Sequence, residues 1–383
     1  MTAVMRGVAS AALVMLSGCA HRAVDMRPSE AEVRAFYYTD DEGLAVVTTG
    51  VQVAQRLPWG DTLGVEVALD AIDLEPVDAV SSASTSWDDD PGLQEQRYEL
   101  APSYALALGS SEEPIELSAR GRFSSEPDYL SWAGELGATA ELCERNTTIA
   151  GFVGYGHDTI DPSSFAADDA GRWPDSHERV YGGLALRQLL GKRVDVAGGV
   201  SLTWQSGALE SPYRRAQVVV GRGFFADLVA LSERHPGERT RAVAFLSTST
   251  YLGEGLALHV RAAGYLDSWD VQAFAPELAL DLELGDFGLL ILGYRFTVQG
   301  AASFYANRYD DGDTVRTGDR RLGALDEHLG GFELRWTVLG RPGLVDSLEL
   351  AGGWQLSLLT YRDVVPERAV RAHQVTLGVL YRY

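Results

Sequence analysis

The sequence lacks a long apolar run, and this absence excludes membrane-spanning helices. No uninterrupted apolar stretch in the 383 residues reaches the roughly 18 that a membrane helix needs. A transmembrane β-barrel remains open, because its strands alternate apolar and polar side chains and contain no such run. The 41 glycines suit the tightly packed, bent strands of such a wall.

Positive charge is also scarce. The 32 basic residues, of which only Lys192 is a lysine, are outnumbered by 54 acidic residues, and the formal net charge is −22. This balance disfavours nucleic acid as a partner, since its phosphates would be repelled.

Cysteine is nearly absent, and the two that are present differ in context. Arg6 precedes the apolar stretch Val8–Leu16, and Leu16-Ser17-Gly18 precedes Cys19. This pattern predicts an export signal over residues 1–18, lipidation of Cys19 at a lipobox, and a tether over 19–30. The alternative is an ordinary cleaved signal with an incidental cysteine. If Cys19 carries lipid, Cys143 has no partner and no disulfide forms.

Alternation with a period of two fills the rest of the chain. In the last fourteen residues, one face carries Val375, Leu377, Val379, Tyr381 and Tyr383. This pattern predicts a strand with one apolar face, and outer-membrane barrels usually end on such an aromatic-terminated strand. The same alternation recurs in residues 63–70, 115–123, 277–284, 290–297 and 348–358.

The connections favour a barrel over a soluble β-sandwich, which also alternates. Short turns near residues 57–61, 110–113, 144–146, 191–192, 253–254 and 285–286 lie between long polar segments at 73–96, 158–178, 205–239 and 300–326. Outer-membrane barrels have short periplasmic turns on one rim and long external loops on the other. We therefore predict an all-β, up-and-down antiparallel barrel of about 16 strands over residues 31–383, or about 18 if Tyr213–Gly221 is a wall strand.

Several stretches occur in a characteristic order: Val77–Ser84, Glu95–Glu99, Arg145–Thr148, Ser211–Arg215, Glu233–Arg241, Gln299–Tyr305, Asp319–Leu322 and Arg371–Gly378. The ordered set, spanning roughly residues 30–383, resembles a family of bacterial outer-membrane barrels catalogued as a domain of unknown function, number 3570. The resemblance implies a transmembrane barrel and no established activity. The lipobox departs from the family, whose members resemble ordinary signal-peptide barrels.

Recognisable catalytic motifs are missing from the sequence. The seven histidines are scattered, with no HExxH motif or metal-site grouping, and no GxSxG motif is present. A triad assembled in space from loop residues remains open. We expect no enzyme activity, no cofactor and no resident metal.

Charged side chains take the inward position of the predicted strands. A sealed apolar core would not tolerate them unless they were paired, whereas a barrel of this size leaves room for water. They either line an aqueous pore and set its selectivity, or form ion pairs along a solvated or loop-plugged wall. The predicted lumen-lining residues are Glu66, Asp70, Glu116, Arg120, Arg122, Arg261, Glu277, Asp281, Glu283, Arg295, Glu333 and Arg335.

The predicted outer loops are acidic, and aromatic residues occur near strand ends. Clusters such as Asp88–Asp90, with Glu95 in the same loop, and Asp310–Asp313 are candidate sites for divalent cations, or are simply a solvated rim. The aromatics fit interfacial girdles, or hydrophobic packing in a soluble protein. They are Phe36, Tyr37, Tyr38, Trp59, Trp132, Trp204, Tyr361, Tyr381 and Tyr383.

These observations predict a porin-like passive channel, or a transport component for small hydrophilic solutes, in the outer membrane of a Gram-negative-type bacterium. Its expected partners are outer-membrane lipid, lipopolysaccharide and the barrel-assembly machinery. The acidic loops favour cations as the permeating ions. The alternatives are a non-conducting scaffold whose outer loops recruit a partner, and a lipid-anchored soluble β-sandwich.

Overall fold

The structure is a computed structural model of the chain. It describes residues 29–74, 93–109, 113–162, 171–222, 226–285, 288–340, 346–364 and 368–383. The predicted export signal and the predicted lipidation site, Cys19, lie outside these residues. Cys143 is an exposed free thiol in the turn after β6.

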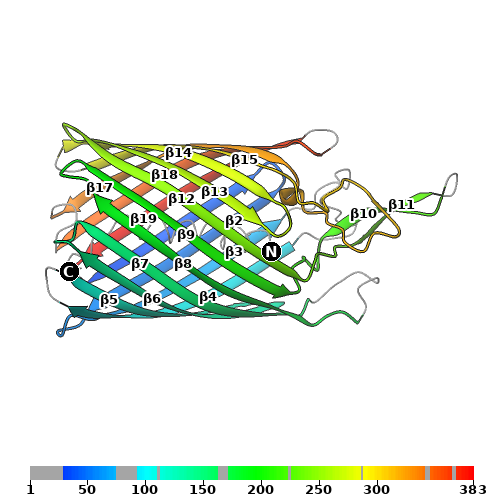
Figure 1. Ribbon diagram of the computed structural model, residues 1–383, viewed down its shortest axis with the longest axis horizontal. Coiled ribbons are helices and arrows are strands. Elements are labelled where there is room, and N and C mark those ends of the chain that lie inside the picture. Colours follow the sequence, from blue (N-terminus) through cyan, green and yellow to red (C-terminus); the bar gives the residue numbers. More distant parts are fainter. Residues whose placement is uncertain are drawn as a thin grey trace.

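Sixteen antiparallel strands of the described chain close into one barrel (Figure 1). The first strand pairs with the last along its whole length, from Glu30 opposite Arg382 to Asp40 opposite Ala372. Closure leaves no free edge in this sheet. It also excludes the soluble sandwich alternative, which requires two sheets packed face to face.

The predicted strand count of 16 is confirmed, and the six predicted short turns all fall at connections between consecutive wall strands. The wall strands are β1 (Glu30–Asp40), β2 (Leu44–Arg56), β3 (Thr62–Leu74), β4 (Leu93–Gly109), β5 (Pro114–Glu126), β6 (Tyr129–Leu142), β7 (Thr147–Ile160), β8 (Asp175–Leu189), β9 (Val194–Gly207), β12 (Glu238–Gly253), β13 (Leu256–Asp267), β14 (Gln272–Glu283), β15 (Gly288–Gln299), β17 (Leu325–Leu339), β18 (Ser347–Tyr361) and β19 (Arg368–Arg382).

The outward face of the wall is apolar and exposed. On β6, for example, Leu136 is 63% exposed, while its neighbours along the strand point inward. A closed barrel with an apolar exterior satisfies its backbone within the wall and presents hydrocarbon to lipid. The protein is an outer-membrane β-barrel. No helix in the described part of the chain is long and apolar enough to cross a membrane.

Most of the aromatics predicted for girdles are exposed, but not all of them. Trp59, Trp132 and Trp204 are exposed. Tyr38 and Tyr361 are instead buried among apolar side chains near the ends of β1 and β18, because they occupy inward positions of those strands. Phe36 is also inward, half-buried and packed against the cluster that holds Tyr38. For these three residues the girdle prediction was wrong.

The two rims of the barrel differ. At the rim that holds Glu30 and Arg382, which we call the terminal rim, every connection is short, the longest being residues 340–346 between β17 and β18. At the opposite rim, which we call the outer rim, some connections are also short, such as 41–43 and 127–128. The longest ones there are 208–237 and 300–324.

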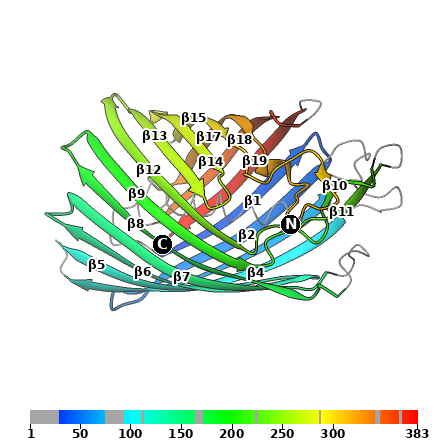
Figure 2. The ribbon, with the colours of Figure 1, turned by 45° about the vertical axis from the view of Figure 1, so that its right-hand side comes forward.

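These two long connections form what we call the outer cap. They contain β10 (Arg215–Val220), β11 (Asp227–Ser232), β16 (Tyr309–Asp310) and a 3-10 turn, η4 (Arg320–Leu322). The three strands form a separate small sheet in the order β11-β10-β16. Figures 1 and 2 show the β10–β11 hairpin extending beyond the outer rim, away from the lumen. The segment Tyr213–Gly221 is therefore not part of the wall.

Candidate functional site: the lumen wall and the outer cap

Ion pairs run along the inward face of β3, β4 and β5, between adjacent strands and, for Arg120 and Glu66, across β4. Arg120 Nη2 lies 2.7 Å from Glu66 Oε2, and Arg122 Nη2 lies 2.6 Å from Glu99 Oε2. Arg97 pairs with Asp70. All of these charged side chains lie on the inward face, and the exposed apolar side chains of the same strands lie on the outward face, because successive residues of a strand point to opposite faces.

A second row of charges crosses β13, β14, β15 and β17. Glu277 lies in register between Arg261 and Arg295, and Arg295 Nη2 lies 3.4 Å from Glu327 Oε2. Alternating signs across adjacent strands compensate the charge along the row. The His259 ring, also inward, lies 3.1 Å from the Asp281 carboxylate.

The remaining predicted residues lie on the same inward face towards the terminal rim. Arg335 Nε lies 2.6 Å from Glu333 Oε1 on β17. Glu116 lies near the start of β5 and Glu283 ends β14, and neither forms an ion pair with another described residue. All twelve predicted residues thus share one face; whether that face borders a conducting pore stays a prediction.

One ion pair near mid-height of the inward face keeps contact with solvent. The side chains of Arg120 and Glu66, near the middle of their strands, are each 35% exposed. Solvent-accessible ion pairs at this depth indicate a wetted interior, since a filled core would bury them completely.

Glycines allow large inward side chains to lie flat against the wall. A Cβ on Gly154 of β7 would overlap the ring of Tyr181, its register partner on β8. In the same way, a Cβ on Gly156 would lie 2.5 Å from Nε of Arg179, which extends over this glycine to Asp158. These glycines keep the ring and the guanidinium along the wall.

Asp158, at the outer end of β7, is the centre of a buried polar network. Its carboxylate accepts hydrogen bonds from Ser131 Oγ at 2.6 Å and Arg179 Nη1 at 2.9 Å, and His177 Nδ1 lies 2.9 Å away. His177 Nε2 contacts the side chain of Gln205, not the Ser131 hydroxyl. This geometry ties β6, β7, β8 and β9 together and differs from a nucleophile–base relay, in which the serine contacts the histidine.

The outer cap is held by polar contacts between its two segments. Arg214 pairs with Asp319. Glu233, whose side chain is fully buried, accepts hydrogen bonds from Thr317 Oγ1 at 2.9 Å and from the Gly318 amide at 2.7 Å. The sequence names the stretches that contain Arg214, Glu233 and Asp319 but does not predict these pairings, because the partners lie about eighty or more residues apart.

The cap is also attached around the outer rim. Arg320 Nη1 donates to Glu42 at 2.7 Å in the β1–β2 turn. The Tyr213 hydroxyl donates to Asp128, in the turn between β5 and β6. Phe304 packs edge-on against Trp269, in the turn after β13, with ring centroids 5.3 Å apart. The cap therefore spans the mouth and contacts turns from different parts of the rim.

Titratable groups of the cap lie around a cavity of about 20 Å³. His235 lines it, and its Nε2 is buried without a hydrogen-bond partner. Burial lowers the pKa of His235, although the charge of Glu233 opposes this shift. Burial raises the pKa of Asp319, but the charges of Arg214 and Arg321 outweigh burial and hold that pKa below its ordinary value.

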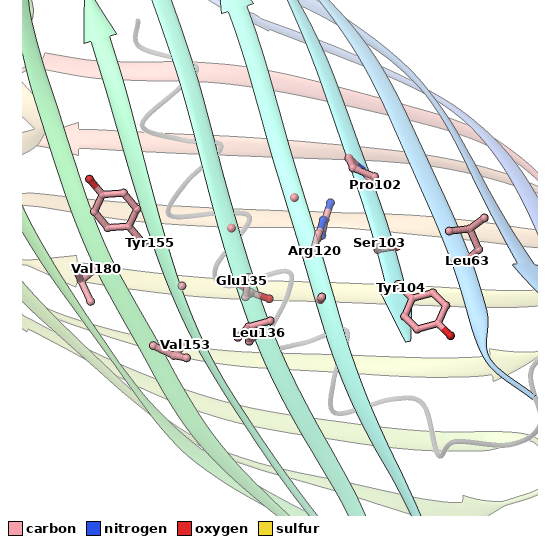
Figure 3. A pocket seen from close by; sticks show the side chains of 14 residues that line it. Leu63, Pro102, Ser103, Tyr104, Arg120, Glu135, Leu136, Val153, Tyr155 and Val180 are labelled. Atoms are coloured by element: carbon pink, nitrogen blue, oxygen red, sulfur yellow. The ribbon is translucent and has the colours of Figure 1, made fainter. Parts of the chain in front are cut away.

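A larger hollow, of about 720 Å³, lies on the outward side of the wall (Figure 3). It is lined mainly by apolar groups, including Leu136, Val153 and Tyr155. Strand pairing between β4 and β5 is interrupted beside Pro102 and Gly121, which leave little side-chain volume there. This hollow faces lipid and is unsuited to a hydrophilic solute.

The acidic residues predicted as candidate cation sites differ in their surroundings. Asp88–Asp90 lies outside the described residues, and Asp310–Asp313 closes on itself through a 2.7 Å hydrogen bond from the Asp310 amide to Asp313 Oδ2. Glu95, in contrast, meets Glu126 and Asp128, with carboxylate oxygens of all three within 4.8 Å of one another. The sequence pattern did not reveal this group, because β5 and its turn bring the last two residues back to β4.

Comparison with solved structures finds similar barrels at low identity. The ferric enterobactin receptor of Pseudomonas aeruginosa, in a mutant form, has a TM-score of 0.45 and 11% identity over 87% of this chain and 53% of the receptor. The chain thus spans about half the length of that receptor. A bacterial polysaccharide outer membrane secretin has a TM-score of 0.48 and 8% identity over 94% of this chain and 99% of the secretin. A loop-deletion mutant of OmpT, an outer membrane protein of Vibrio cholerae, has a TM-score of 0.41 and 10% identity over 93% and 98%.

Comparison with curated proteins finds no match. A family described as "Protein of unknown function (DUF3570)" matches residues 75–350, which make up most of the barrel. The match agrees with the resemblance seen in the ordered sequence stretches. The chain belongs to this family of outer-membrane β-barrels.

Proposed function

We propose that the protein is a porin-like channel through which small hydrophilic solutes cross the outer membrane passively, beneath a cap that restricts the outer mouth. One observation carries this proposal: ion pairs at mid-height of the inward wall, such as Arg120–Glu66, remain partly exposed to solvent. Water that reaches these groups offers polar solutes a path through the barrel. The side chains held flat over Gly154 and Gly156 support the same conclusion, since they keep the path wide.

The charge distribution favours cations. Most inward arginines are neutralised by a neighbouring carboxylate, whereas Glu116 and Glu283 have no cationic partner among the described residues. Unpaired carboxylates on a confined wall raise the local concentration of cations. With a net charge of −22 on the chain, we infer a modest preference for cations.

A second candidate is a scaffold that recruits a partner at the cell surface. The projecting β10–β11 hairpin favours it, because Leu228 of β11 is 45% exposed beyond the outer rim. The two functions are compatible in one molecule, and they differ in whether the lumen conducts.

Outer-membrane lipid, lipopolysaccharide and the barrel-assembly machinery are the protein's proposed partners during insertion and residence. Lipidation of Cys19 and the absence of enzyme activity stay predictions.

Single-channel conductance of the refolded protein in a planar bilayer tests the proposal. A matched variant lacks the β10–β11 hairpin. In it, Asn-Gly replaces residues 216–231 and joins Arg215 to its register partner Ser232, so that Arg214 and Glu233 stay in place. We expect stepwise conductance from both proteins. Conductance from neither, with insertion verified by circular dichroism and by resistance to protease, would reject the channel and leave the scaffold.

A further inference from the structure

Three carboxylates from two strands and a turn meet at the outer rim. Glu95 lies near the start of β4, Glu126 ends β5, and Asp128 lies in the turn that leads to β6. One oxygen from each lies within 4.8 Å of the other two, and these groups are buried. Like charges this close repel one another strongly in a site shielded from water.

Among the described residues, no guanidinium forms an ion pair with this group. Arg97, the closest along β4, is paired with Asp70, and Arg122 on β5 is paired with Glu99. Glu95 and Glu126 form no ion pair with any described residue. The three carboxylates therefore have no ion-pair partner in the described part of the chain, although the charge of Arg97 acts on Glu126 from a distance.

A second observation points to a ligand. Oε1 of Glu126 is shielded from solvent and has no hydrogen-bond partner among the residues that the structure describes. Glu95 beside it is only 9% exposed. A buried carboxylate oxygen without a donor is costly, and metal coordination is one of the ways in which proteins satisfy such a charge.

We propose that Glu95, Glu126 and Asp128 form a binding site for a divalent cation of the calcium type. Ca²⁺ binds oxygen ligands at about 2.3–2.6 Å, so that one ion spans oxygens up to about 5 Å apart. Mg²⁺ requires about 2.0–2.1 Å and near-octahedral geometry, whereas Ca²⁺ accepts irregular sets of carboxylate oxygens such as this one. Water supplies the remaining ligands.

The ion would also connect the wall to the cap. Asp128 accepts a hydrogen bond from the Tyr213 hydroxyl of the cap, and its backbone carbonyl accepts one from the Asp161 amide at 2.9 Å. An ion on the Asp128 carboxylate orients it towards Tyr213. Binding therefore stabilises both the rim between β4 and β6 and the attachment of the cap.

The test uses the refolded full-length protein in detergent, free of lipopolysaccharide and stripped with EDTA. Isothermal titration with CaCl2 is expected to show one site per chain, with Mg²⁺ binding at least tenfold more weakly. Tb³⁺ should bind at the same site and be displaced by Ca²⁺. Ca²⁺ should also raise the temperature of thermal unfolding, because a ligand that binds only the folded form stabilises it.

The variant Glu126→Gln with Asp128→Asn removes two charges and should weaken Ca²⁺ binding at least tenfold. Asp270→Asn is the matched control: it removes one exposed carboxylate from another outer-rim turn, at a residue with a positive φ that asparagine tolerates. It should bind Ca²⁺ like the wild type. If the double variant does not fold, Glu95→Gln takes its place. Absence of Ca²⁺ binding by folded wild type, or equal binding by the variants, would overturn the proposal.

Discussion

Arg214 and Asp319 form an ion pair that joins the two segments of the outer cap, from residues more than a hundred positions apart in the chain. The Asp319 side chain is 10% exposed, and its carboxylate also accepts a 3.0 Å hydrogen bond from the Arg321 amide at the start of η4. The pair therefore holds one cap segment against a turn that contacts the rim through Arg320.

Arg214→Ala should loosen the cap and leave the barrel closed. Removal of one partner from a buried pair leaves an uncompensated charge and costs about 3–5 kcal/mol. The partial exposure of Arg214, 21%, places the expected effect at the lower end of that range. Hydrogen exchange of residues 208–237 should accelerate at least tenfold. Arg335→Ala is the control, because the Arg335–Glu333 pair is exposed at the other end of the wall; equal acceleration in both variants would contradict the assignment.

The cap should loosen on acidification. The pKa of His235 is lowered by burial, so stability is lost as the pH falls below the ordinary histidine value of 6.5 towards the lowered one. The pKa of Asp319 is lowered by Arg214 and Arg321 against the opposing effect of burial, so its contribution is complete above the ordinary value of 3.8 and is lost as the pH falls through the lowered one.

Conductance or exchange of the cap between pH 7.5 and 4 measures this response. We expect opening to increase as the pH falls below about 6.5, and His235→Gln to remove that first part of the profile. A cap whose exchange is insensitive to pH, after correction for intrinsic amide rates, would show that neither group controls it.

Cation preference should decrease when the unpaired inward carboxylates are neutralised. Glu116→Gln with Glu283→Gln removes two negative charges from opposite parts of the wall near the terminal rim. The reversal potential in a KCl gradient should move towards zero while conductance stays measurable. Glu144→Gln, in the turn after β6, serves as the control and should leave selectivity as it is. A larger shift of the reversal potential in the control than in the double variant would mean that charges at the terminal rim set the selectivity.

Gly154→Ala should displace the Tyr181 ring from the wall. Because the new Cβ overlaps the ring, we expect a cost of about 1–3 kcal/mol and a lower single-channel conductance as the ring turns into the lumen. Gly134→Ala on β6 is the control, since a Cβ there meets nothing within 4 Å. The measurements are the unfolding temperature and the single-channel conductance of the two variants. If Gly154→Ala and Gly134→Ala gave identical values, Tyr181 would not limit the width of the lumen.

The architecture of the barrel could be predicted because its signals are local. Alternation such as Leu63, Val65, Val67 and Leu69 reports a strand and its lipid-facing side without knowledge of its neighbours. Short connections lie between long ones along the chain, as in barrels with turns on one rim and loops on the other, and this predicts an even number of strands. Tyr38 and Tyr361 show the limit of this reasoning: they are aromatic and near strand ends, yet inward and buried.

The amino-acid sequence by itself determined the alternating strands, the even number of crossings, the charged inward face and the family. Only the tertiary structure decided that residues 208–237 and 300–324 form one cap, that Tyr181 lies flat over Gly154, and that Glu95 meets Glu126 and Asp128. The physical reason is the range of the interactions. A strand's faces follow from a two-residue period along the backbone, whereas the cap and the carboxylate group depend on side chains that meet only after the barrel has closed.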